Sequence, residues 1–268
     1  MAIHSMAIVS PKAEIHKDAE IGPYCIIGES VLIGERSSIG AHTVIDGHTQ
    51  IGSNCKIYPH VSIGLPPQDL TYKGENTQTI IGNNVTLREF CSVHKATTKG
   101  DGKTEIGNNC YLMNYVHVGH DCKLQNDIII ANSTNLGGHV QIGERVTMGG
   151  GCMVHQHVVI GDFVMAAGLS GIQKSVPPFV LVGGLPAKIA RMNSVGLKRI
   201  GLESSEIKII EEVYRLIKNS GVSAALKEFE PKAAEFPHLM KLINFYKNSN
   251  KGVTGFMTRG RNESDSNS

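Results

Sequence analysis

The chain has 268 residues, with 26 Lys and Arg against 24 Asp and Glu and a formal net charge of +2. This length allows a sizeable core, and so balanced a charge gives no general reason to expect nucleic acid or an anionic membrane as partner. Residues 1–10 lack the features of a signal peptide, and no run of about eighteen apolar residues occurs. We therefore expect a cytoplasmic protein without stable membrane insertion.

An apolar, mostly branched residue recurs at every sixth position in the first two thirds of the chain. The series runs from Ile3 to Ile63, resumes at Ile81, and continues from Ile106 to Ile172. Neither the period of a helix nor that of one strand explains this spacing, so the chain has to turn repeatedly. Two interruptions, near residues 65–79 and 95–105, predict loop excursions.

A small or β-branched residue stands four positions after each apolar one and is expected to point inward with it. All six cysteines occupy this position, namely Cys25, Cys55, Cys91, Cys110, Cys122 and Cys152. Free cysteine packs as a small apolar residue, and no C-x2-C spacing indicates a metal site. We interpret all six as buried, reduced side chains, as in a cytoplasmic protein.

This pattern resembles the hexapeptide-repeat acyltransferases. Their fold is a left-handed parallel β-helix with three hexapeptides per triangular coil. The resemblance implies this mainly β fold for residues 1–182, including its hand, since ordinary parallel crossovers are right-handed.

The repeat ends at residues 176–178 (VPP), because proline cannot donate a hydrogen bond to a β-ladder. Beyond it we expect an α-helical C-terminal domain over residues 183–255. Its first helix is capped by Ser204 and Ser205 and ends at Gly221, and further helices cover residues 224–229 and 237–247. Residues 256–268 are expected to be disordered.

Five of the twelve histidines lie between residues 117 and 157. One exposed histidine at a corner needs no explanation, but histidines stacked on consecutive coils predict the wall of an active site. With eighteen residues per coil, the predicted columns are His120, Gly138 and Gln156 in one and Asp121, His139 and His157 in the next, with His117 and His155 beside them.

Four stretches narrow the resemblance: residues 114–122 (NYVHVGHDC), 136–140 (LGGHV), 154–156 (VHQ) and 176–178 (VPP). They are similar to the signatures of the acyl-[acyl carrier protein]:UDP-N-acetylglucosamine O-acyltransferase family, and the similarity covers nearly the whole chain. It implies transfer of a fatty acyl group, expected to be 3-hydroxylated, from acyl carrier protein to the 3-hydroxyl of UDP-N-acetylglucosamine. This reaction is the first step of lipid A biosynthesis. The resemblance also implies a homotrimer without a bound cofactor or metal.

The reaction needs a base, because a sugar hydroxyl is a poor nucleophile at neutral pH and imidazole is suited to take its proton. His120 is the predicted base, and Asp121 either stabilises its imidazolium or orients a neighbour. That pairing requires the corner to bend, since adjacent side chains of a strand point to opposite faces. The resemblance assigns the amide of Gly138 as the oxyanion donor.

Further roles come from the resemblance, apart from a basic stretch that the charges of the sequence indicate. Gly168 is matched to the position that sets acyl length, although it could equally be a corner glycine. Lys188, Arg191 and Lys198 form, with Arg199, a basic stretch that is either the dock for an acidic carrier protein or a solvated surface. The residues implied to bind the sugar nucleotide are Gln68, Asp69, His117, His139, His155, Gln156, Asn193 and Arg199.

Three departures from the family pattern, at Thr71, Val195 and Ile200, leave open an acceptor with a 3-amino group. A γ-carbonic-anhydrase-like zinc enzyme is an alternative interpretation. However, His117 and His120 lack the five-residue offset that separates the two same-chain zinc ligands of those enzymes. An acyltransferase that uses coenzyme A and a noncatalytic solenoid are the remaining alternatives.

Overall fold

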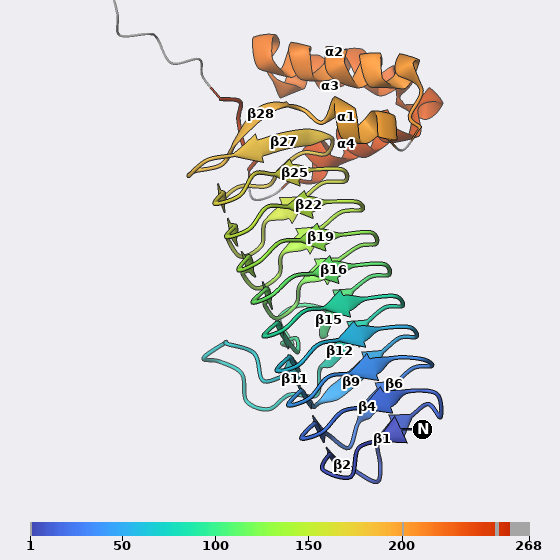
Figure 1. Ribbon diagram of the computed structural model, residues 1–268. Coiled ribbons are helices and arrows are strands. Elements are labelled where there is room, and N and C mark those ends of the chain that lie inside the picture. The colour runs from blue at the N-terminus through green and yellow to red at the C-terminus, as the bar shows by residue number, and fades with distance from the viewer. Residues whose placement is uncertain (1, 200, 250–251, 258–268) are drawn as a thin grey trace, which may run out of the picture.

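The computed structural model describes residues 2–199, 201–249 and 252–257. Short parallel strands wind into a triangular β-helix, and helices cover its C-terminal end (Figure 1). None of the helices in these ranges has the length and apolarity needed to cross a bilayer.

The strands form three sheets, one on each face of the triangle. The first sheet contains β1 (Ala2–Ile3), β4 (Glu20–Ile21), β7 (Ser38–Ile39), β10 (Lys56–Ile57), β13 (Thr86–Leu87), β16 (Tyr111–Leu112), β19 (Ile129–Ile130), β22 (Thr147–Met148), β25 (Met165–Ala166), β27 (Val180–Gly183) and β28 (Lys188–Met192). The second contains β2 (Ile8–Val9), β5 (Ile26–Ile27), β8 (Val44–Ile45), β11 (Ser62–Leu65), β14 (Ser92–His94), β17 (His117–Val118), β20 (Asn135–Leu136), β23 (Met153–Val154) and β26 (Gly171–Ile172). The third contains β3 (Glu14–Ile15), β6 (Val31–Ile33), β9 (His48–Ile51), β12 (Gln78–Ile81), β15 (Lys103–Ile106), β18 (Lys123–Leu124), β21 (Gln141–Ile142) and β24 (Val159–Ile160).

The register aligns residues eighteen apart, as the repeat predicts. His117 pairs with Asn135, and Leu136 pairs with Val154. The sixth-position residues from Ile21 to Ile172 are buried in the core, together with all six cysteines, which are free. The interpretation of the cysteines as buried, unpaired side chains is confirmed.

Two excursions leave the β-helix at the same corner, between the second and third sheets. The first excursion (residues 66–77) joins β11 to β12, and the second excursion (residues 95–102) joins β14 to β15. β12 pairs in register with β9 on one side and β15 on the other, so the longer corners leave the ladder intact.

The C-terminal helices are α1 (Ser194–Arg199), α2 (Ser204–Ser220), α3 (Val222–Phe229), the 3₁₀ helix η1 (Glu230–Glu235) and α4 (Pro237–Asn248). The three predicted helices correspond to α2, α3 and α4, and Gly221 ends α2 with a φ of 88°. The predicted serine cap is wrong: Glu203 is the N-cap residue of α2 and makes no side-chain capping bond, and Ser204 is already inside the helix.

The first sheet continues beyond the prolines at 177 and 178. β27 pairs in parallel with β25, and β28 pairs antiparallel with β27. The prolines precede β27, where no ladder donor is required, so they end the hexapeptide pattern without ending the sheet. Phe256 bridges Ile189, whereas residues 258–268, most of the predicted disordered tail, lie outside the described residues. The domain division at residue 182 stays a prediction.

Candidate active site

A cavity of about 520 Å³ lies against the second sheet, at the corner that carries the excursions. It brings together six of the residues singled out from the sequence: Gln68, His117, His120, Gly138, His155 and Gln156. The remaining lining residues are His94, Gly119, Asn135, Leu136, Gly137, Met153 and Val154.

His120 and Asp121 form a hydrogen-bonded pair at this corner, with Nδ1 and Oδ2 2.8 Å apart. Asp121 has a φ of 60°, in the left-handed region, and this bend turns its side chain back toward the preceding imidazole. An ionised carboxylate can only accept, so Nδ1 carries the proton and Nε2 of a neutral His120 is left as an acceptor. That is the tautomer a general base needs.

Gly138 lies directly beside this imidazole, one coil further along. A Cβ at this position would come within 2.6 Å of Nε2 of His120, so any side chain would displace the ring. Its carbonyl accepts from the amide of His157, whereas no described residue accepts from the N–H of Gly138. An unengaged amide beside this imidazole can donate to a developing oxyanion.

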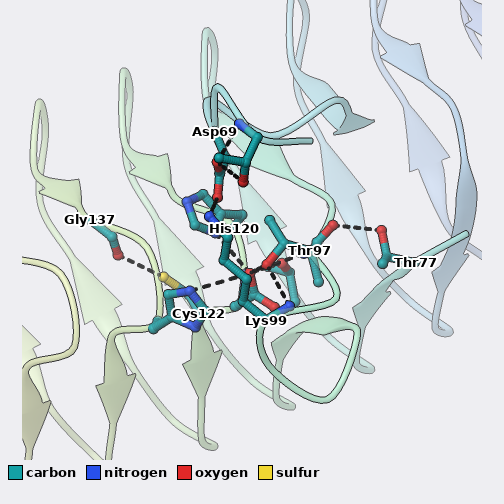
Figure 2. Close-up of polar contacts among 12 residues, drawn as sticks. Asp69, Thr77, Thr97, Lys99, His120, Cys122 and Gly137 are labelled. Atoms are coloured by element: carbon teal, nitrogen blue, oxygen red, sulfur yellow. Dashed lines mark hydrogen bonds and ion pairs between the residues drawn. The ribbon is translucent and has the colours of Figure 1, made fainter. Parts of the chain in front are cut away.

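Asp121 is almost fully enclosed, with 2% of its side chain exposed. Its Oδ2 accepts from both the amide and the hydroxyl of Thr97, at 3.0 and 2.8 Å (Figure 2). Its own amide donates to Oγ1 of Thr104 at 2.8 Å. No described residue donates to Oδ1.

His139 also lies beside the carboxylate, with Nε2 3.7 Å from Oδ2 of Asp121. Its ring stacks on His157 at a centroid distance of 4.5 Å. Burial lowers the pKa of His139, and the charge of Asp121 opposes this shift. The stacked column predicted from eighteen-residue spacing is therefore present.

His117 and His94 supply uncharged polar groups to the cavity. Nδ1 of His117 lies 2.8 Å from Oγ of Ser92, and the ring of His94 lies edge-on at a centroid distance of 4.9 Å. Burial lowers the pKa of His117, and it lowers the pKa of His94 to about 4. His94 was missed from the sequence, because the second excursion separates it from the regular repeat.

Asp69 belongs to the first excursion but does not line the cavity. It pairs with Lys99 of the second excursion and accepts from the amide and hydroxyl of Thr71 at 2.8 Å (Figure 2). The bonds from Lys99 and Thr71 hold the pKa of the Asp69 carboxyl well below its usual range. Thr71, which departs from the family pattern, is thus a partner of Asp69.

Several predicted residues lie elsewhere within the described chain. Asn193 donates to the carbonyl of Phe163 and accepts from the amide of Gly196 at the start of α1. Gly168 lies between β25 and β26, at the corner of the first and second sheets rather than that of His120. Arg191, Lys198 and Arg199 are exposed and Lys188 is half-buried, and none of the four lines the cavity. Ile200 lies outside the described residues.

His120, Asp121 and His139 have ligating atoms within 4.8 Å of one another, as a metal site would require. Nδ1 of His120 donates to Oδ2 of Asp121 at 2.8 Å, and a protonated ring nitrogen cannot ligate an ion. The contacts therefore favour an acid–base pair over a cation site.

A ladder of hexapeptide coils with a histidine–aspartate pair at one corner is typical of a hexapeptide-repeat transferase. Accordingly, the family model "Bacterial transferase hexapeptide (six repeats)" matches residues 12–47, 30–64 and 103–138. The model "Udp N-acetylglucosamine O-acyltransferase; Domain 2" matches residues 176–254.

Full-length relatives carry the same description. An acyl-[acyl-carrier-protein]–UDP-N-acetylglucosamine O-acyltransferase of a Sulfurihydrogenibium species is 51% identical over 94% of this chain and 93% of its own. The protein of that name from Thermodesulfovibrio yellowstonii is 43% identical over 94% and 98%. The chain belongs to the acyl-[acyl carrier protein]–UDP-N-acetylglucosamine O-acyltransferase family and is an acyltransferase.

Solved structures agree with this assignment. LpxA from Acinetobacter baumannii has a TM-score of 0.92 at 38% identity, covering 95% of this chain and 100% of that one. The UDP-N-acetylglucosamine acyltransferase of Francisella novicida has a TM-score of 0.91 at 35% identity, covering 94% of each chain. The predicted fold class, a left-handed parallel β-helix with C-terminal helices, is confirmed.

Proposed function

We propose that this chain transfers a 3-hydroxy fatty acyl group from acyl carrier protein to the 3-hydroxyl of UDP-N-acetylglucosamine. This is the first step of lipid A biosynthesis. Within a family so named, the observation that carries the proposal is the His120–Asp121 pair, whose free Nε2 faces Gly138 in a cavity.

The proposed reaction is direct transfer without an acyl-enzyme. Nε2 of His120 takes the proton of the sugar hydroxyl as that oxygen attacks the thioester carbonyl carbon. The tetrahedral intermediate collapses, the carbon–sulfur bond breaks, and the imidazolium returns the proton to the departing thiolate. The products are the O-acylated sugar nucleotide and the free thiol of the carrier.

The surrounding groups stabilise the charges that this reaction creates. Asp121 faces the imidazolium that forms on His120, and the amide of Gly138 donates to the oxyanion. Removal of one such donor typically costs about 3 kcal/mol of transition-state stabilisation. Gln68, His117, His155 and Gln156 bind the acceptor from the cavity wall. Asp69, His139, Asn193 and Arg199 remain proposed contacts, although none of the four lines the cavity of this chain.

The carrier protein is proposed to dock on the basic stretch that contains Lys188, Arg191, Lys198 and Arg199. Lys198 and Arg199 lie in the last turn of α1, and Arg191 is exposed in β28. Acyl carrier protein is acidic as a class, so complementary charge would guide its approach.

A homotrimer is proposed because the acyl-length position and the base lie at different corners of one chain. Gly168 and His120 come together only if the corner of a neighbouring copy packs against the cavity. Exposed apolar side chains beside both positions, Leu169 at 79% and Met153 at 56%, support such a contact. The six free cysteines support a reducing, cytoplasmic location.

An assay with 3-hydroxyacyl carrier protein and UDP-N-acetylglucosamine tests the proposal, with His120→Ala as the inactive variant. We expect a loss of about 10²- to 10⁴-fold in kcat. Equal rates for the wild type and the variant would show that His120 is not the base.

Thr71 and Val195 favour a second candidate, the same transfer to a 3-amino analogue of the sugar. Thr71 bonds to Asp69, which is one of the proposed acceptor contacts, so this departure would alter a group that meets the acceptor. Comparing turnover of the hydroxyl and amino acceptors decides between them, and exclusive use of the amino form would reject O-transfer.

A further inference from the structure

The second excursion folds over Asp121 and holds its carboxylate. Thr97, which is 4% exposed, donates to Oδ2 from both its amide and its hydroxyl. Its Oγ1 also accepts from the amide of Lys99 at 3.2 Å, which leaves the hydroxyl proton free to point at the carboxylate. The hydroxyl of Thr97 therefore accepts from the amide of Lys99 and donates to the carboxylate of Asp121.

The excursion also restricts the second oxygen of this carboxylate. A Cβ on Gly100 would lie 2.9 Å from Oδ1 of Asp121, so the backbone of the excursion packs closely there. Three donors converge on Oδ2, from Thr97 and His120, and none from a described residue reaches Oδ1. Rotation of the carboxylate would break all three bonds, so its orientation is set.

We infer that Thr97 is a positioning residue of the acyl transfer, acting through Asp121 to hold the imidazole of His120. The inference rests on the proposed function and extends it to a residue that does not line the cavity. A carboxylate fixed at Oδ2 keeps the proton of His120 on Nδ1 and its Nε2 aimed at Gly138. The group that orients a catalytic histidine needs such support, because small rotations there are costly.

Thr77 offers a matched control, because its hydroxyl also bonds within the contact between the two excursions. The hydroxyl of Thr77 donates to the carbonyl of Ala96 at 2.6 Å, which ties the first excursion to the second (Figure 2). Thr77 is 2% exposed and makes no bond to Asp121. Thr77→Val therefore removes a buried threonine hydroxyl next to the excursion and leaves the carboxylate with its three donors.

The experiment compares Thr97→Val, Thr97→Ser and Thr77→Val in the full-length protein, with kcat and both KM values measured. A hydrogen bond to a charged group is worth a factor of about 10 to 100, so Thr97→Val should lower kcat by that factor. We expect both KM values to stay within about twofold and Thr97→Ser to restore most of kcat, because serine keeps the donor. An equal loss of kcat in Thr77→Val would show mere loosening of the excursion and overturn the inference.

A double-mutant cycle tests whether Thr97 works through the carboxylate. In an Asp121→Ala background, Thr97→Val should change kcat by less than about twofold, since the group it orients is gone. A full further loss in that background would overturn the inference. If the wild type fails to acylate the sugar nucleotide, the proposed function fails. If the wild type is active and Thr97→Val matches it, only the role of Thr97 fails.

Discussion

Oδ2 of Asp121 lies 2.8 Å from Nδ1 of His120, although the two residues are consecutive. Consecutive side chains in a strand point to opposite faces, so this contact exists only because the corner places Asp121 at a φ of 60°. The β-helix makes such a corner every six residues and thus offers a site where neighbours in sequence can cooperate.

Asp121→Asn should reduce kcat by about 10²- to 10⁴-fold, with the fold unchanged. An amide can donate to Nδ1 of His120, which would move the imidazole proton to Nε2 and remove the base. Steady-state kinetics measures the loss. Asp127→Asn is the matched control, because Asp127 also has a φ of 60° at a corner and contacts Asn109 and Arg145 instead. Equal activity of Asp121→Asn and the wild type would contradict the proposed pair.

Gly138→Ala should lower kcat by about 10²- to 10³-fold, a range typical of a damaged oxyanion site. The added Cβ would overlap the imidazole of His120, whereas in the control Gly255→Ala it meets nothing within 4 Å. Single-turnover rates with both variants measure the chemical step. Unimpaired transfer by Gly138→Ala would show that the ring can move aside without loss.

Gly168→Met should shift donor preference toward shorter acyl chains. A Cβ at this position meets only the Gly150 backbone, at 3.3 Å and beyond, so a longer side chain would project from the corner. We expect kcat/KM for long acyl groups to fall at least about 100-fold relative to short ones, because overlap with the chain end excludes it. Gly168→Ala, which adds one methyl group, is the control. If the dependence of kcat/KM on acyl-chain length did not change, Gly168 would not line the groove that binds the acyl chain.

Charge reversal at Lys188 and Arg191 should raise the KM for the acyl carrier protein and leave that for the sugar nucleotide unchanged. Loss of complementary charge weakens encounter with an acidic partner, and added salt should shrink the difference. Lys17→Glu, at the opposite end of the β-helix, controls for net charge. If all three substitutions act alike, the carrier does not dock on this stretch.

Stability should fall as the pH is lowered from about 6.5 toward 4, in part through His94. Its folded-state pKa of about 4 lies below the ordinary histidine pKa of 6.5, so the unfolded chain binds more protons in this window. The contribution of His94 to the free energy of unfolding is complete above pH 6.5 and is lost as the pH falls toward 4. Melting temperatures should drop less in His94→Gln than in the wild type between these pH values. Parallel curves would show that His94 does not titrate in this way.

The hexapeptide period was enough to predict the coils and the columns of the site. Spacing by eighteen residues placed Gly138 beside His120 and His139 beside Asp121, because the ladder repeats without slippage. The contacts of Thr97 and Lys99 could not be predicted, since the excursions follow no period and their side chains meet through tertiary folding. For Asn193 the family pattern predicted a substrate contact, but the oxygen of its side-chain amide accepts from Gly196 and caps α1. The sequence pattern does not reveal this structural use.

Both excursions emerge at the corner of His120, while the strands on either side remain paired as if nothing had been inserted. In a solenoid each coil needs only its two neighbours, so extra residues at a corner cost little beyond the entropy of the loop. Insertions at this corner can therefore change the surroundings of the cavity without disturbing the strand pairing of the β-helix. Evolution, or a protein engineer, can remodel the rim of the cavity by insertion and deletion while the rungs that align the histidines stay as they are.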